Sequence, residues 1–207
     1  MSARFAAPLI LIIIVFIMIY SFMGTEISEK DYIETIQSSR VETQEYMKND
    51  PDSPFNKKGE VKFNGLKYFE VDSKYKVKAN IERLTSPEPT DIQMTNGETE
   101  KYFKYAIATF TLDGQLQNLL LLKSEKYWDE DMLFLPFYDA TSANESYGGG
   151  RFLNLEYTDQ DILEIDFNLA YNPYCAYTDT YRCPIPPSEN NITVEVRAGE
   201  RIYDDHH

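Results

Sequence analysis

Two runs in the second half of the chain combine residue types that could bind a ligand. The first extends from Asn144 to Arg151 and places three consecutive glycines, Gly148 to Gly150, directly before the arginine. Bare backbone N–H groups in such a loop can hold an anion or a carbonyl, and the Arg151 guanidinium is a fork-shaped donor. The same run also suits a simple turn between strands, because glycine tolerates positive φ. No Lys-Ser or Lys-Thr pair follows, so the run is not a P-loop.

The second run extends from Asp166 to Tyr177 and is rich in tyrosine and asparagine. These side chains could line a polar pocket for a small molecule or a peptide. In the alternative interpretation, the rings pack on the core, the hydroxyls bond to backbone, and Asn172-Pro173 starts a turn. Across both runs, the candidate ligand-binding residues are Glu145, Tyr147, Gly148, Gly149, Gly150, Arg151, Asn168, Tyr171, Asn172 and Tyr174.

Cys175 and Cys183 are the only cysteines. In an oxidising compartment they would form a disulfide, and in a reducing one they could be a metal pair or a thiol nucleophile. The histidines are restricted to His206 and His207 at the end of the chain, and no C-x-x-C motif is present. A metal site or a Cys-His pair therefore lacks its other members. We expect a disulfide between Cys175 and Cys183, no metal ion and no cofactor.

Carboxylates near the two runs allow a catalytic alternative. Glu145 or Asp166 could act as acid or base, with Arg151 and Asn168 donating to an oxyanion or a phosphate. This arrangement would make the protein an envelope-associated hydrolase. With 34 acidic residues in the chain, such combinations also arise by chance. No catalytic residue is assigned on this basis.

The chain of 207 residues has a formal net charge of -14. An acidic surface of this kind repels the phosphate backbone of nucleic acids. We therefore expect no nucleic acid among the partners. The length is sufficient for one domain with a hydrophobic core.

Residues 5–23 contain no charged side chain and read FAAPLILIIIVFIMIYSFM. A helix of this length reaches about 28 Å, enough to span the hydrocarbon core of a bilayer. A cleaved signal peptide is the alternative, but the apolar run is long and the following residues make a poor cleavage site. The sequence predicts a single-pass transmembrane anchor with a short head, residues 1–4. The brevity of that head and the two cysteines favour a C-terminal domain outside the cytoplasm.

The elements that would position these residues follow the anchor. Residues 24–54 predict a helical stalk that ends in a linker containing Pro51 and Pro54. Residues 55–203 predict a β-rich domain, and residues 204–207 form a tail. Asp113-Gly114 between two apolar runs is the strongest hairpin signal, and Asn96-Gly97 is a weaker one. The predicted strands are 61–71, 74–84, 101–112, 115–123, 132–138, 151–157, 162–169 and 192–197. The fold class is mainly β, an antiparallel barrel or sandwich.

Several of these runs together resemble a prokaryotic family known as domain of unknown function 1684. The resemblance rests on 145–153, 166–177, 183–187 with Glu189-Asn190, and 197–200, and upstream on 53–55 and 63–69. It implies a single β-rich domain with no assigned activity, cofactor or catalytic residue. The resemblance also implies that many members lack an anchor. If the family pattern contains both cysteines in such cytoplasmic members, it would suggest a thiol or packing role for them. Phe152 and Asn154 stand where the family pattern implies Tyr and Asp.

The sequence favours a binding or scaffolding module that displays its acidic domain on the outer face of a membrane. In this hypothesis the Gly148 to Arg151 loop and the Tyr171 to Cys183 segment form one recognition surface for a small molecule or a peptide. The hydrolase described above is one alternative. The other is a structural subunit with a protein partner in a larger membrane complex.

Overall fold

The computed structural model describes residues 28–57 and 61–203. The chain divides into two compact units, Met1–Thr35 and Ile36–His207, and the second contains the whole sheet. Helix α2 (Glu29–Asn49) begins after Ser28, whose Oγ accepts a hydrogen bond from Asp31 N at 3.2 Å. It ends before Asp50-Pro51, because the residue before a proline disfavours helix.

The β-rich unit begins at Ile36 and not at the predicted Phe55. Within this unit, the last turns of α2 pack on the residues that follow them. Gln44 exchanges two hydrogen bonds with the backbone of Leu66, at 2.9 and 3.0 Å. Met47 joins a buried cluster with Phe55 and Leu66. The prediction of a stalk separated from the domain is therefore wrong for residues 36–49, which form part of the β-rich unit.

Six strands form one antiparallel sheet in the order β5-β4-β3-β2-β1-β6. The turn between β2 and β3 contains Asp113 and Gly114, with φ of 47° and 76°. Two positive φ values identify the primed turn that the Asp-Gly pair predicts. The strands are β1 (Lys76–Gln93), β2 (Thr99–Leu112), β3 (Gln115–Ser124), β4 (Met132–Phe137), β5 (Arg151–Glu156) and β6 (Ile162–Asp166).

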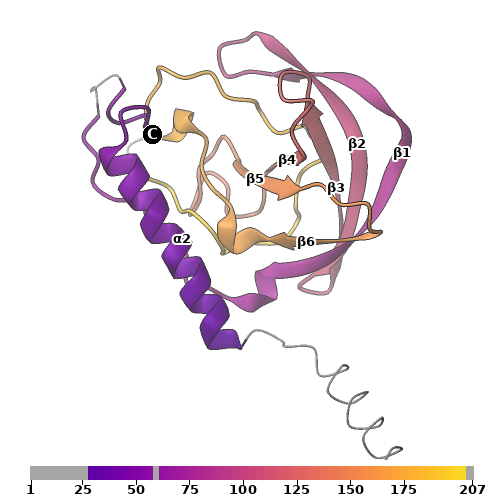
Figure 1. Ribbon diagram of the computed structural model, residues 1–207, viewed down its shortest axis with the longest axis horizontal. Helices are drawn as coiled ribbons and strands as arrows, with labels where there is room; N and C mark the ends of the chain where they lie inside the picture. Colours follow the sequence, from indigo (N-terminus) through magenta and orange to yellow (C-terminus); the bar gives the residue numbers. More distant parts are fainter. Residues whose placement is uncertain (1–27, 58–60, 204–207) are drawn as a thin grey trace, which may run out of the picture. The chain divides into compact units, whose positions relative to one another are not determined.

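The sheet curls into a nearly closed barrel, which decides between the predicted barrel and sandwich (Figure 1). Near its open edge, Phe152 of β5 exchanges two backbone hydrogen bonds with Tyr171, at 2.9 and 3.0 Å. Tyr171 follows β6 after the short helix η2 (Phe167–Leu169). The chain after β6 thereby joins the two edges of the sheet.

The main core lies on one face of the sheet, where alternate strand residues meet the C-terminal segment. It includes Ala106, Leu121, Leu135 and Ile165, all 0% exposed. On β3, Leu119 to Leu122 are all buried, so this strand is covered on both faces. Two smaller clusters lie elsewhere, one around Met47 and Tyr177 and one around Tyr102 and Leu122.

Two of the predicted strands, 61–71 and 192–197, are absent from the sheet. In the second, Ile192, Val194 and Val196 are buried alternately, which is the pattern that predicted a strand. However, the backbone of this segment forms hydrogen bonds with the loop after β4 and not with a strand. Ala140 N donates to Val194 O at 3.2 Å, and Ile192 N donates to Tyr138 O at 2.8 Å. In the predicted strand 61–71, the β-type pairing is limited to a single bridge between Tyr68 and Glu200. Alternating burial shows an extended chain, which need not belong to a sheet.

No helix within residues 28–57 and 61–203 has the length and apolar composition needed to cross a membrane. Helix α2 carries charged residues throughout. The predicted anchor, residues 5–23, and the head before it lie outside the described residues. The absence of such a helix from the described residues contradicts the membrane location predicted from the sequence.

Candidate functional site

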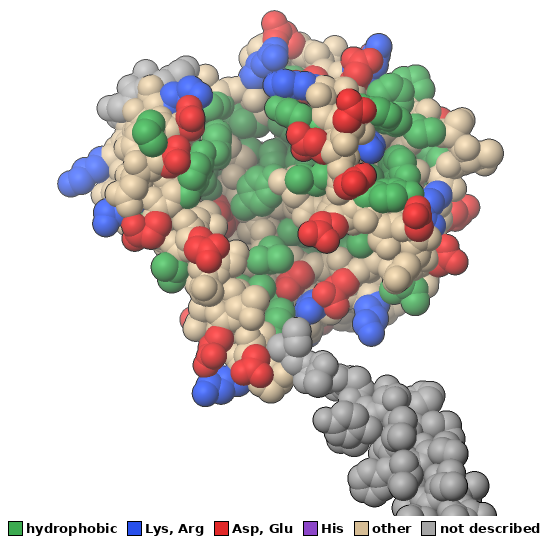
Figure 2. All heavy atoms as spheres, in the orientation of Figure 1, with side chains coloured by type: hydrophobic (Ala, Val, Ile, Leu, Met, Phe, Trp, Pro, Cys, Tyr) green, Lys and Arg blue, Asp and Glu red, His purple; other side chains and the backbone are tan. Residues whose placement is uncertain are grey.

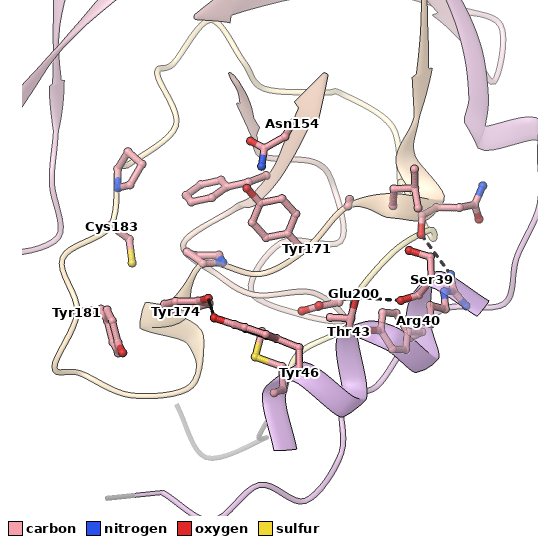
Figure 3. Close-up of a pocket in the computed structure, with 18 of the residues that line it drawn as sticks. Ser39, Arg40, Thr43, Tyr46, Asn154, Tyr171, Tyr174, Tyr181, Cys183 and Glu200 are labelled. Carbon is pink, nitrogen blue, oxygen red and sulfur yellow. Dashed lines mark hydrogen bonds between the residues drawn. The ribbon is translucent and has the colours of Figure 1, made fainter. Parts of the chain in front are cut away.

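A cavity of about 660 Å³ opens between α2, β5 and residues 168–184 (Figure 3). Its volume falls within the range of about 300–1,000 Å³ that is usual for small-molecule sites. Its residues come from parts of the chain far apart in sequence. They are Ser39, Arg40, Thr43, Tyr46, Met47, Tyr68, Tyr127, Phe152, Asn154, Asn168, Leu169, Ala170, Tyr171, Pro173, Tyr174, Tyr181, Arg182, Cys183, Pro184 and Glu200.

Six tyrosines form much of this wall: Tyr46, Tyr68, Tyr127, Tyr171, Tyr174 and Tyr181. The hydroxyls of Tyr46 and Tyr174 lie 3.2 Å apart and connect α2 to the short helix η3 (Tyr174–Ala176). Burial raises the pKa of Tyr171 to about 12, while a hydrogen bond with Asn154 acts in the opposite direction. The Tyr171 phenol is therefore neutral near pH 7. Each of the six side chains offers an apolar ring with a polar end.

The side of the cavity next to α2 carries Arg40. Its guanidinium donates to Phe69 O at 2.9 Å and to Asn168 O at 3.4 Å. It also lies over the Tyr68 ring, 4.6 Å from the centroid, which is a cation–π distance. Arg40 therefore ties α2 to two loops and stacks against a tyrosine of the cavity.

Glu200 is a buried carboxyl group in the cavity wall, with 2% of its surface exposed. Its Oε2 accepts hydrogen bonds from Tyr177 Oη at 2.6 Å and from Asn172 N at 3.0 Å. Burial raises the pKa of Glu200 to about 7, although these two hydrogen bonds and the nearby Arg151 and Arg40 lower it. The side chain therefore changes charge near neutral pH.

A second hollow of about 390 Å³ adjoins the cavity. Both are lined by Tyr127, Phe152, Asn154, Tyr171 and Pro184. The second is more apolar, with Phe134 and Met132 in its wall. On the face shown in Figure 2, hydrophobic side chains gather around a hollow, and charged side chains stand around it. An elongated molecule could extend from one space into the other.

Arg151 does not face the cavity, and its prediction as a ligand donor is wrong. The side chain is fully buried and pairs with Asp139, with 2.7 Å between Nη2 and Oδ2. It also donates to Val196 O at 2.8 Å, to Glu200 O at 3.1 Å and to Ala198 O. Burial lowers the pKa of Arg151, and Asp139 acts in the opposite direction.

The carbonyls that Arg151 holds belong to every second residue of the extended C-terminal segment. Asp139 Oδ1 binds the same segment by accepting from Val196 N at 3.0 Å. The buried pair supplies hydrogen bonds that a neighbouring strand would otherwise give. This explains how residues 192–198 alternate in burial without joining the sheet.

The glycine loop is a tightly packed turn that does not line the cavity. Gly150 has φ of 85°, and a Cβ atom there would lie 2.8 Å from Phe137 O and 2.7 Å from Pro186 Cγ. A Cβ atom at Gly149 would meet the Tyr147 ring at 2.4 Å. The turn therefore needs glycine for backbone geometry and close approach, as in the simpler of the two sequence interpretations.

Other members of the predicted recognition surface are dispersed. The Glu145 carboxylate pairs with Arg197 at 2.8 Å on the surface, and Tyr147 Oη donates to Cys175 O at 3.4 Å. Asn172 is buried next to the cavity and donates through Nδ2 to Arg201 O at 2.9 Å. Of the ten predicted ligand-binding residues, only Asn168, Tyr171 and Tyr174 line the cavity.

The arrangement required for the hydrolase alternative is not assembled. Asp166 Oδ1 accepts a hydrogen bond from Asn168 N at 2.9 Å and caps η2. Glu145 is paired with Arg197, and Arg151 is committed to Asp139. These groups do not converge on one position where a substrate could react.

Cys175 and Cys183 form a disulfide with Cα atoms 6.2 Å apart. Cys183 lies in the cavity wall, and its N donates to Thr95 Oγ1 at 3.1 Å. The bond therefore connects η3 to the proline-rich segment, and both contribute residues to the cavity wall. Among the described residues, no group of three or more His, Cys, Asp or Glu could hold a metal ion.

Sequence reasoning missed Arg40, Tyr46, Tyr68 and Glu200. Arg40 and Tyr46 lie on the segment predicted as a stalk, and Tyr68 and Glu200 lie in or beside strands that do not form. One signal was available: Tyr32, Ile36, Arg40, Thr43 and Met47 recur at helical spacing, which indicates a face that packs. Nothing in the local sequence distinguishes Glu200 from the other 33 acidic residues.

Comparison with known proteins gives a family and a fold but no activity. Residues 61–201 match the family described as protein of unknown function DUF1684. An uncharacterized protein of Haloarcula marismortui, whose structure was determined by solution NMR, is 35% identical with a TM-score of 0.64. The match covers 86% of this chain and 97% of that one. No curated protein matches. The sequence and fold together show that this chain belongs to the DUF1684 family.

Proposed function

We propose that the protein is a binding module for a small, largely apolar molecule that carries one or two hydrogen-bonding groups. The observation that carries this proposal is the cavity of about 660 Å³ between α2, β5 and residues 168–184. Its tyrosine, phenylalanine, proline and methionine side chains offer an apolar wall, and a few polar groups can orient a ligand. The adjoining hollow of about 390 Å³ provides room for an elongated molecule.

The charge of the chain narrows the ligand class. At a formal net charge of -14, the surface disfavours the approach of anions. Arg40 and Arg182 are the cations of the cavity wall, and both have partners. Arg40 bonds to two backbone carbonyls, and Arg182 pairs with Glu98 at 2.7 Å. A neutral or cationic ligand therefore fits the site better than a carboxylate or a phosphate.

A bulky side chain in the cavity should block binding of a neutral aromatic probe. Thr43 lies in the cavity wall on α2, so Thr43→Trp would place an indole in the space that a ligand needs. We expect the full chain to bind N-phenyl-1-naphthylamine saturably, with an increase in probe fluorescence. In Thr43→Trp the affinity should fall at least about tenfold, which corresponds to about 1.4 kcal/mol.

Val41→Trp is the matched control, because Val41 is on the same helix, is 61% exposed and does not line the cavity. Its affinity for the probe should equal that of the unaltered protein. Circular dichroism spectra measured alongside the titrations should show that both variants are folded. Equal loss of binding in both variants, or no saturable binding by the unaltered protein, would contradict the proposal.

A further inference from the structure

The Glu200 carboxyl has an oxygen atom that the protein does not use. Both hydrogen bonds that this group accepts in the described chain end on Oε2, from Tyr177 Oη and Asn172 N. Oε1 accepts none, although the side chain is 2% exposed and lines the cavity. Oε1 is not among the fully buried atoms without a partner, so it is open to the cavity, and a ligand in that space can donate a hydrogen bond to it.

The nearby cations do not form an ion pair with Glu200. Arg151 is paired with Asp139, and Arg40 donates to the carbonyls of Phe69 and Asn168. Within residues 28–57 and 61–203, none of the ion pairs at 4.0 Å or less contains Glu200. The carboxylate is therefore buried without a direct counter-ion, which is an uncommon situation for an ionised group.

The Glu200 backbone is held firmly, so the carboxyl has a fixed position. Glu200 N donates to Ala170 O at 2.8 Å, and Arg151 donates to Glu200 O at 3.1 Å. On either side, Phe69 N donates to Gly199 O at 3.0 Å and Arg201 N to Lys67 O at 2.9 Å. A carboxyl held in this way is preorganised for a ligand, because little conformational freedom remains to be lost on binding.

We propose that Glu200 is the anchoring residue of the cavity and that it binds the protonated amine of an aromatic or otherwise apolar ligand. The inference rests on the proposed binding function and specifies its ligand class. The ammonium group would donate to Oε1, and the apolar part of the ligand would lie among Tyr171, Tyr174 and Phe152. Figure 3 shows Glu200 beside Arg40 and facing the space bordered by the labelled tyrosines.

Three features favour an ammonium group over a neutral donor. A hydrogen bond between two charged partners is about twice as strong as one between neutral groups. The tyrosine faces attract a cation, and this attraction increases when the cation is removed from water. The acidic surface also concentrates cations near the opening of the cavity.

Binding of the amine should depend on pH through Glu200. The charged or titratable groups that act on its carboxyl are Arg40 of α2, Tyr68 before β1, Arg151 of β5, and Tyr171 and Tyr177 after β6. Burial and its partners raise the pKa of Tyr177 well above its usual range, so the tyrosine remains a donor near neutral pH. Glu200 is therefore the group whose charge changes, from neutral at acidic pH to anionic above about 7.

A matched set of ligands tests the inference by calorimetry or fluorescence titration on the full chain. The set is 2-naphthylmethylamine, 2-naphthalenemethanol and 2-naphthoate, which share a ring system and differ in charge. At pH 8 we expect the amine to bind at least about tenfold more tightly than the alcohol, and the naphthoate to bind weakest. Below pH 7 the affinity of the amine should fall by up to about tenfold per pH unit, and that of the alcohol should not change.

Glu200→Gln is the variant that isolates the charge. Gln keeps an oxygen for Tyr177 and Asn172, and we expect it to lower the affinity for the amine at least about tenfold, so that the amine no longer binds more tightly than the alcohol. Equal affinity of amine and alcohol in the unaltered protein would overturn the inference and leave the binding function intact. If none of the three ligands binds, both the inference and the binding function fail. If Glu200→Gln does not fold, the pH dependence of the unaltered protein decides alone: a flat profile for the amine rejects the role of Glu200.

Discussion

Replacing Arg151 by methionine should lower the free energy of unfolding by about 3–5 kcal/mol, the cost of removing one partner of a buried ion pair. Arg151 is 1% exposed and Asp139 is 5% exposed, so the substitution would leave the Asp139 carboxyl group buried without its partner. The carbonyls of Val196, Ala198 and Glu200 would lose their donor at the same time. Urea denaturation at pH 7 measures the change.

Arg197→Met provides the control for the loss of an arginine from the same region. Arg197 pairs with Glu145 and Glu195 at 2.8 and 2.7 Å, but its side chain is 49% exposed. Exposed pairs contribute about 0–1 kcal/mol, so the control should be nearly neutral. A cost below about 1 kcal/mol for Arg151→Met would contradict the structural role given to Arg151 and would reopen its interpretation as a ligand donor.

Gly199→Ala should destabilise the protein by about 2–5 kcal/mol, combining positive φ with overpacking. Gly199 has φ of 72°, and a Cβ atom there would lie 2.4 Å from Ala170 O and 2.8 Å from Phe167 O. Both neighbours are backbone atoms, which cannot rotate out of the way. Because Glu200 follows directly, the cavity wall should be displaced, and the naphthyl probes should bind more weakly.

Gly114→Ala separates the two causes, since Gly114 has φ of 76° but no atom within 4 Å of the Cβ position. It should cost about 1 kcal/mol, the penalty for positive φ alone. Thermal unfolding monitored by circular dichroism compares the two variants. If their midpoints fall equally, the close contacts around Gly199 do not exist in solution.

The sheet is predictable from sequence where the signals are local. Asp113-Gly114 specifies a two-residue turn by itself, and the alternating burial of β2 determines which of its residues face the core. The segment 192–197 carries the same alternation but lies outside the sheet. Whether an extended segment pairs with a strand depends on residues distant in sequence, here Asp139 and Arg151, and no local pattern contains that information.

The candidate site shows the same limit more clearly. Tyr171 and Tyr174 were predicted because they stand together in an unusual run. Tyr46 and Glu200 were missed because their contacts, with Tyr174 and Tyr177, are made across the fold. Arg151 was misassigned because arginine next to glycines looks the same in sequence whether the guanidinium faces a ligand or the core. Burial, which decides this, is a property of the folded chain.

The most direct test of the proposed binding function is a titration of the isotope-labelled full chain with 2-naphthalenemethanol, followed by amide NMR spectra. We expect saturable shifts at the side-chain amides of Asn154 and Asn168 and at the backbone amides of Thr43, Tyr171 and Tyr174, all of which line the cavity. The amides of Gly148 to Arg151, which do not line it, should change little. An absence of saturable shifts, or shifts centred on the glycine loop, would contradict the proposal.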